Sequence, residues 1–183
     1  MIKYEEIHNI VEKTNGLMHK HVETSFLFEL ASSLKQNNNV LELGSHQGCS
    51  SICLGFGATN TGGSVFCVDS WCNQDKDYFL FWRENVYSNG LKNVFPIMGD
   101  ANKVLKGINI SNLGLIFIDT GHSYEDCKTQ FELATRNVSD GCIVAFHDYG
   151  HPHYPGVKQY CDEITNAGIL VNTKRISGTY CGE

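Results

Sequence analysis

The amino-acid sequence predicts an α/β fold: one doubly wound, mostly parallel sheet with helices on both faces. Short apolar runs alternate along the chain with segments of helical periodicity, which is the pattern of repeated strand–helix units. Several of these runs end in an acidic residue, and ligands of parallel sheets bind at the carboxyl ends of the strands. A chain of 183 residues is long enough for one such domain.

Composition excludes several classes of function. The chain is 42% hydrophobic and 19% charged, which is typical of a globular protein. Its net charge of −6 offers no basic face for nucleic-acid phosphates. The opening residues, MIKYEEIHNI, do not resemble a signal peptide, and no apolar run reaches membrane-spanning length. We therefore expect a cytoplasmic protein whose eight cysteines are reduced and mostly fill apolar space.

The chain is expected to form a single domain, 1–183, with a helical lead-in, 1–38, before a core, 39–183. Apolar spacing predicts helices over 3–19 and 24–36, the second with Thr24 as N-cap. Two roles are open for the lead-in: it packs against the core, or it covers the cofactor or shapes the substrate mouth.

The core elements follow in alternation. Pro96 interrupts the third strand and suggests an outer position, and Pro155 suits the first turn of the last helix. Helices are expected from about residue 49, over 77–88, after the capping sequence 123–126, and from 155. Strands are expected at 40–43, 64–69, 94–98, 115–119, 142–146 and 168–171.

The stretch VLELGSHQGCSS, residues 40–51, is the point around which the chain is organised. It predicts a strand, a glycine turn and a helix start, a unit that presents backbone N–H groups to a ligand. Gly44 and Gly48 permit close approach, since neither carries a Cβ. Glu42 is costly inside a buried strand unless it is paired. The glycine spacing fits neither a dinucleotide fingerprint nor a P-loop.

This E-x-G-x-x-x-G pattern resembles the first motif of class I S-adenosylmethionine (SAM) dependent methyltransferases, above all the small-molecule O-methyltransferases, including the catechol type. The resemblance covers roughly residues 38–165. It implies a Rossmann-like, seven-stranded sheet whose last strand runs antiparallel beside the sixth. Only about SGTYCGE remains for that strand, which leaves two alternatives, a complete or a truncated last strand.

The resemblance also implies how SAM is bound at its methionine end. Gly44 and Gly48 would cradle the methionine, and Glu42 would bind its amino group. Ser50 and the backbone near Ser45 and His46 would hold its carboxylate.

At the nucleoside end, Asp69 follows the glycine turn at a distance typical of a ribose-binding carboxylate. Trp71, preceded by Ser70, would lie near the adenine or would simply pack. Asp100, followed by Ala101, would bond the adenine edge or cap a helix.

Two further segments, IDTGHSYE at 118–125 and HDY at 147–149, resemble the IDGxHSYE and HDY motifs of a subgroup of these enzymes. Carried over, the resemblance implies that Asp119, His147 and Asp148 bind a divalent cation, which would lower the pKa of an attacking hydroxyl. The catechol type uses Asp, Asp and Asn, so the histidine is a departure. Mg²⁺ or Mn²⁺ is expected: two carboxylates suit Mg²⁺, while the imidazole shifts the preference toward Mn²⁺, Fe²⁺ or Zn²⁺.

His122 takes the place of the lysine that acts as base in the catechol-type enzymes. Its unperturbed pKa of about 6.5 suits proton abstraction near neutral pH. We therefore expect catalytic roles for His122, Asp119 and His147, with a helix cap as the alternative for His122. His151 and His153 would lie in a solvated loop, unless they add ligands or line the mouth.

The predicted function is SAM-dependent methyl transfer to a hydroxyl of a small molecule, such as a sugar or a polyketide-type metabolite. Two alternatives are a metal-dependent hydrolase or oxygenase built on the histidines and aspartates, and a SAM-binding module without catalysis. The expected partner is the small-molecule acceptor; nucleic acid and membrane are not expected, and exposed sheet edges are compatible with a homodimer.

Overall fold

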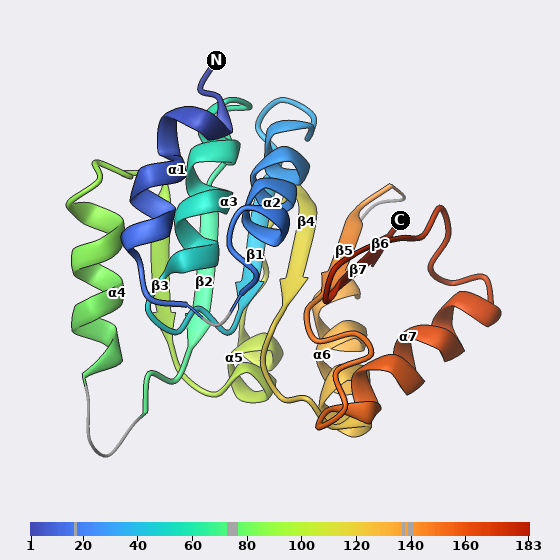
Figure 1. Ribbon diagram of the computed structural model, residues 1–183. Coiled ribbons are helices and arrows are strands. Elements are labelled where there is room, and N and C mark those ends of the chain that lie inside the picture. The colour runs from blue at the N-terminus through green and yellow to red at the C-terminus, as the bar shows by residue number, and fades with distance from the viewer. Residues whose placement is uncertain (17, 73–76, 137, 139–140) are drawn as a thin grey trace.

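A computed structural model describes residues 1–16, 18–72, 77–136, 138 and 141–183. It contains a seven-stranded sheet in the order β3-β2-β1-β4-β5-β7-β6 (Figure 1), in which β1 to β5 are parallel and β7 runs antiparallel to both of its neighbours, β5 and β6. The predicted doubly wound, mostly parallel α/β fold is confirmed. The strands are β1 (Asn39–Leu43), β2 (Val65–Asp69), β3 (Val94–Met98), β4 (Leu113–Ile118), β5 (Ile143–Phe146), β6 (Lys174–Ile176) and β7 (Thr179–Gly182).

Helices cover both faces of the sheet, because successive strand residues point to opposite sides. Val40 and Phe117 belong to one apolar cluster with α1 to α4, and Leu41 and Ile116 to the other with α5 to α7. The helices are α1 (Tyr4–Lys13), α2 (Val22–Ser32), α3 (Cys49–Thr59), α4 (Tyr78–Tyr87), α5 (Ala101–Gly107), α6 (Tyr124–Thr135) and α7 (Pro155–Asn166).

The last predicted strand is present as β7, but the predicted sixth strand is wrong. Segment 168–171 follows the end of α7, where Leu170 is buried while Ile169 and Val171 are exposed. The sixth strand is instead the polar segment β6, which forms the edge of the sheet and pairs only with β7 among the described residues. β7 lies between β5 and β6 and pairs with both of them.

Helix α2 begins earlier than predicted. His21 is its N-cap, and Thr24 lies inside the first turn. The Thr24 hydroxyl accepts a hydrogen bond from the His21 N–H (2.9 Å) and is bonded to the Tyr4 hydroxyl (2.6 Å), so it joins the two lead-in helices.

Two local expectations about prolines are confirmed. Pro96 lies in the edge strand β3, and Pro155 opens α7. All eight cysteines are free, and Cys72 alone is exposed. Among the described residues, no helix has both the length and the apolar character that crossing a membrane requires.

Backbone hydrogen bonds between neighbouring strands bring the carboxyl ends of β1, β4 and β5 to one level. The N–H of Asp119 donates to the Leu43 carbonyl (2.8 Å), and that of His147 to the Ile118 carbonyl (3.0 Å). The polar residues that follow these strands therefore meet at one edge.

Candidate active site

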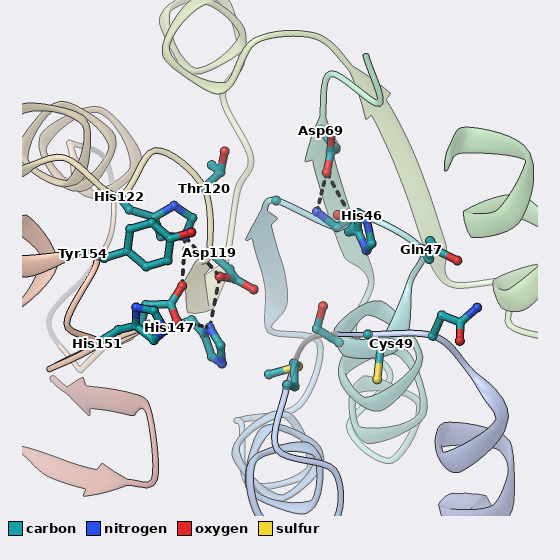
Figure 2. A pocket seen from close by; sticks show the side chains of 17 residues that line it. His46, Gln47, Cys49, Asp69, Asp119, Thr120, His122, His147, His151 and Tyr154 are labelled. Atoms are coloured by element: carbon teal, nitrogen blue, oxygen red, sulfur yellow. Dashed lines mark hydrogen bonds and ion pairs between the residues drawn. The ribbon is translucent and has the colours of Figure 1, made fainter. Parts of the chain in front are cut away.

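A cavity of about 560 Å³ lies at this edge of the sheet (Figure 2). Figure 2 shows two sides to it, with Asp119, His122 and His147 on one and His46 and Asp69 on the other. Nine of the residues predicted to act at a site line the cavity: Gly44, Ser45, His46, Ser50, Asp69, Asp119, His122, His147 and Asp148.

The carboxylate of Asp69 fixes the glycine turn by accepting hydrogen bonds from its backbone. Its Oδ2 accepts hydrogen bonds from the N–H groups of Ser45 and His46, both at 2.8 Å, and its Oδ1 accepts from the Trp71 N–H at 2.7 Å. The two amides expected to bind a ligand carboxylate thus donate to Asp69 in this structure. One carboxylate fixes the turn and faces the cavity at the same time.

Glu42 is fully buried behind the turn and does not line the cavity. Its Oε2 accepts hydrogen bonds from the hydroxyls of Ser45 (2.7 Å) and Ser51 (2.5 Å), while its Oε1 has no partner among the described residues. Burial raises the pKa of Glu42 although the serine hydroxyls oppose the shift. Its predicted contact with an amino group stays a prediction.

Five other predicted residues also lie outside the cavity lining. Gly48 precedes α3 at φ +92°, with the Trp82 ring beside it. The Trp71 indole is buried, packs on Phe79 and Trp82, and donates to the His46 carbonyl at 2.8 Å, as the packing alternative implied. Asp100 caps α5 by accepting from the Lys103 N–H. The five are Gly48, Ser70, Trp71, Asp100 and Ala101.

The acidic residues and histidines after β4 and β5 form one cluster. Asp119, His122 and Asp148 place ligand atoms within 4.8 Å of one another. His147 Nδ1 lies 3.2 Å from Asp119 Oδ1 and 3.4 Å from Asp148 Oδ1. The three residues predicted to hold a cation therefore come together, and His122 joins them.

The imidazole of His122 faces both carboxylates. Its Nε2 lies 3.0 Å from Asp148 Oδ2 and 3.8 Å from Asp119 Oδ1. Neither contact has the geometry of a hydrogen bond, so this buried nitrogen has no such partner among the described residues. A buried nitrogen that faces two carboxylate oxygens without bonding them is suited to a shared cation.

Without a cation, the cluster keeps both histidines charged. Asp119 and Asp148 raise the pKa of His122 to about 9. Burial alone would lower the pKa of His147, but Asp119, Asp148 and Glu23 raise it to about 12. A histidine protonated at neutral pH cannot accept a proton. The free cluster therefore opposes the role of base that the ordinary pKa of His122 suggests.

The free energy of unfolding should fall as the pH rises from about 6.5 to above 9. The His122 pKa is near 9 in the folded chain and about 6.5 when unfolded, so its contribution is complete below pH 6.5 and is lost as pH rises through 9. Urea unfolding in EDTA from pH 6 to 10 should show this decline. In His122→Gln the stability should decline less steeply with pH, because only His147 then contributes a raised histidine pKa. An equal slope in the variant and the parent would contradict the assignment.

Several residues that line the cavity escaped sequence reasoning. Gly16, in the loop between α1 and α2, lies so close to α3 that a Cβ there would be 2.7 Å from Cys49 Cβ. The lead-in thus both packs and lines the cavity. The Tyr154 ring stacks on His122 (centroids 4.1 Å apart) and on His151 (4.8 Å), which also lines the cavity, whereas His153 does not. The missed residues are Asn15, Gly16, Met18, Gln47, Cys49, Thr120 and Tyr154.

Comparisons with known proteins agree with this fold. A family model described as a methyltransferase domain matches residues 41–149, more than half of the chain. The uncharacterized protein y4gI of Sinorhizobium fredii is 29% identical over 141 residues, which are 68% of this chain but only 15% of the length of that relative.

Solved structures share the fold over nearly the whole chain. Cofactor-bound Rv0187 from MTB superposes with a TM-score of 0.75 at 17% identity, covering 97% of this chain and 87% of that one. The O-methyltransferase from Bacillus cereus in complex with SAH gives 0.73 at 18% identity, covering 97% and 88%.

Proposed function

Because the chain belongs to the methyltransferase-domain family that matches residues 41–149, we propose that it transfers a methyl group from SAM to a hydroxyl of a small molecule. The observation that carries the proposal is the two-sided cavity, which joins a glycine turn to a cluster of acids and histidines. The Bacillus cereus neighbour binds SAH, the demethylated product of SAM, on the same fold.

The SAM side is supported by the turn and by Asp69. A glycine turn at a helix N-terminus offers backbone N–H groups to a carboxylate. Ser45, His46, Ser50 and Asp69 line the cavity there, and Asp69 would bind the ribose hydroxyls. The volume of about 560 Å³ is in the range of small-molecule sites. Glu42 would exchange a serine hydroxyl for the amino group of the methionine.

The acceptor side is supported by the cluster. Asp119, Asp148 and His147 would hold a divalent cation, with His122 either as a fourth ligand or as the base. Two carboxylates suit Mg²⁺, and the imidazole shifts the preference toward Mn²⁺. A bound cation would lower the pKa of the acceptor hydroxyl. The stacked rings of Tyr154 and His122 would orient the acceptor.

The methyl group needs no activation on a sulfonium, so alignment of oxygen, carbon and sulfur is the main task. Residues of both sides line one cavity, and Asn15, Gly16 and Met18 of the lead-in line it as well. A hydrolase or oxygenase would use the cluster but would leave the glycine turn without a task.

The first experiment is calorimetric titration with SAM and with SAH, in EDTA and then with Mn²⁺ or Mg²⁺. Micromolar binding of either nucleoside would support the cofactor. A screen of hydroxylated acceptors with labelled SAM would then test transfer. Binding without transfer to any acceptor would favour a SAM-binding module. No binding of SAM or SAH under any condition would overturn the proposal.

A further inference from the structure

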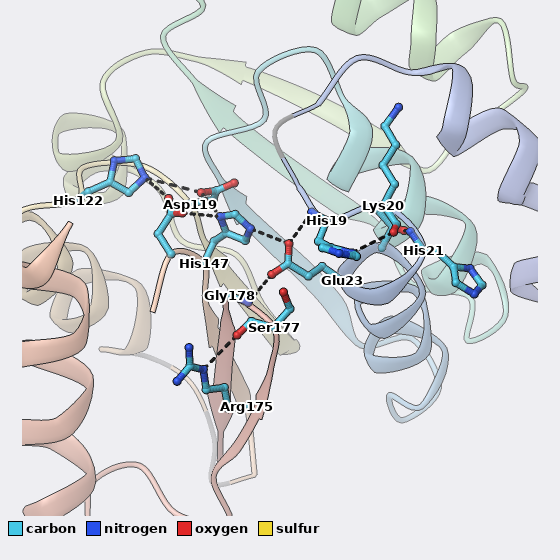
Figure 3. Close-up of polar contacts among 12 residues, drawn as sticks. His19, Lys20, His21, Glu23, Asp119, His122, His147, Arg175, Ser177 and Gly178 are labelled. Atoms are coloured by element: carbon cyan, nitrogen blue, oxygen red, sulfur yellow. Dashed lines mark hydrogen bonds and ion pairs between the residues drawn. The ribbon is translucent and has the colours of Figure 1, made fainter. Parts of the chain in front are cut away.

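Glu23, a residue of the lead-in helix α2, reaches the cluster from outside the cavity (Figure 3). Its Oε2 lies 3.2 Å from His147 Nε2, across 124 positions of sequence. Both side chains are buried, with 3% and 9% of their surface exposed. A carboxylate that is almost fully buried needs a reason to be there, since burial without partners is costly.

The two nitrogens of the His147 ring face different groups. Nε2 meets Glu23, whereas Nδ1 meets Asp119 and Asp148. Once a cation occupies the cluster, Nδ1 must offer its lone pair, and the remaining ring proton must sit on Nε2. An acceptor at Nε2 selects this tautomer and fixes the ring plane.

Glu23 is itself held rigidly by two backbone donors. The His19 N–H donates to Oε2 at 2.7 Å, and the Gly178 N–H donates to Oε1 at 2.6 Å. Gly178 lies in the turn between β6 and β7, and its carbonyl accepts from the Tyr149 N–H at 2.9 Å. The lead-in, the C-terminal hairpin and the loop after β5 thus meet at one carboxylate.

We propose that Glu23 is the positioning residue of His147: it holds the proton on Nε2 and aims Nδ1 at the space between Asp119 and Asp148. This inference rests on the proposed function, because it assigns Glu23 to the cation side of that site. It gives the lead-in a task in the chemistry, since its loop residues Asn15, Gly16 and Met18 line the cavity and its helix α2 would orient a ligand through Glu23. Glu23 does not line the cavity, so it is not expected to touch SAM or the acceptor.

The test compares Glu23→Gln and Glu23→Ala with Thr24→Val as matched control. Thr24 is the next residue of α2 and is also buried. The substitution Thr24→Val removes its hydrogen bonds to His21 and Tyr4 and leaves the contact between Glu23 and His147 in place. Glu23→Gln retains the shape and one acceptor oxygen, so it keeps the test decisive where Glu23→Ala does not fold. Calorimetry measures the affinity for Mn²⁺ and for SAH, and nitrogen NMR with Mg²⁺ follows the His147 ring.

Glu23→Ala should weaken Mn²⁺ binding by about 10- to 100-fold, the usual loss for a partner of a metal-bound histidine, with Glu23→Gln in between. The Glu23 variants should keep the SAH affinity of the parent. The Thr24→Val protein should keep the parent's affinity for both Mn²⁺ and SAH. The Nε2–H signal of His147 should be present in the parent and lost in Glu23→Ala.

The inference is overturned if the Glu23 variants match the parent in Mn²⁺ affinity and in the Nε2–H signal. It is equally overturned if Thr24→Val loses as much affinity, since general loosening of α2 would then account for the effect. Failure of the proposed function looks different: the parent itself would bind no SAH. Where the parent binds SAH but no cation, the Nε2–H signal alone decides the role of Glu23.

Discussion

Gly44→Ala should abolish SAM and SAH binding and should lower the free energy of unfolding by about 2–6 kcal/mol, the sum of left-handed strain and overpacking. Gly44 has φ +89°, a region that residues with a side chain rarely adopt. A Cβ there would lie 2.2 Å from the Asp119 carbonyl oxygen. The obstacle is backbone at the end of β4, so no side chain can rotate away.

The same substitution at Gly107 is the matched control. Gly107 is the last residue of α5, has no left-handed φ, and offers an added Cβ no neighbour within 4 Å. Gly107→Ala should therefore change stability by less than about 1 kcal/mol. Urea unfolding and calorimetry with SAH measure both effects. A Gly44→Ala protein with parental stability and SAH affinity would contradict the close packing of β1 against Asp119.

The fold was predictable because its signals are local. Each parallel strand carries its own apolar run, and each helix its own periodicity, so residues such as Phe117 and Val144 identify their strands without tertiary information. The error at 168–171 has the same origin. Ile169, Leu170 and Val171 are apolar, but only Leu170 finds a buried position. The true strand β6 lies at an edge, where polar residues are tolerated.

The site was predictable only in part because some of its contacts are distant in sequence. Strand ends collect on one edge by topology, which is why Asp119, His147 and Asp148 were found. Glu23 precedes the helix predicted over 24–36, so the sequence assigned it no role, and its partner lies 124 residues away. Asp69 was found for its spacing, yet its bonds to the glycine turn depend on the folded geometry.

Asp119→Asn should lower turnover by about 10²- to 10⁴-fold, the range for loss of acid–base or metal assistance. Asp119 Oδ1 faces His147 Nδ1 at 3.2 Å and His122 Nε2 at 3.8 Å, so its charge supports the whole cluster. Asparagine keeps the shape but removes that charge. Affinity for Mn²⁺ should fall with turnover, while SAH affinity should stay within about twofold, since transition-state stabilisation and not cofactor binding is lost.

Glu125→Gln removes an equal charge from an exposed position on the first turn of α6 and should change neither quantity. If Asp119→Asn keeps parental turnover and Mn²⁺ affinity, the cluster has no part in the chemistry.

His122→Ala then separates the two roles of the histidine, with SAH affinity intact in either case. A base would lose turnover and leave Mn²⁺ affinity unchanged, whereas a ligand would lose both. Because Asp119 and Asp148 hold the pKa of His122 near 9 without a cation, a base role also requires that the bound cation offset those two carboxylates. Turnover that persists in His122→Ala would rule out both roles. The imidazole of His122 would then serve to pack against the Tyr154 ring.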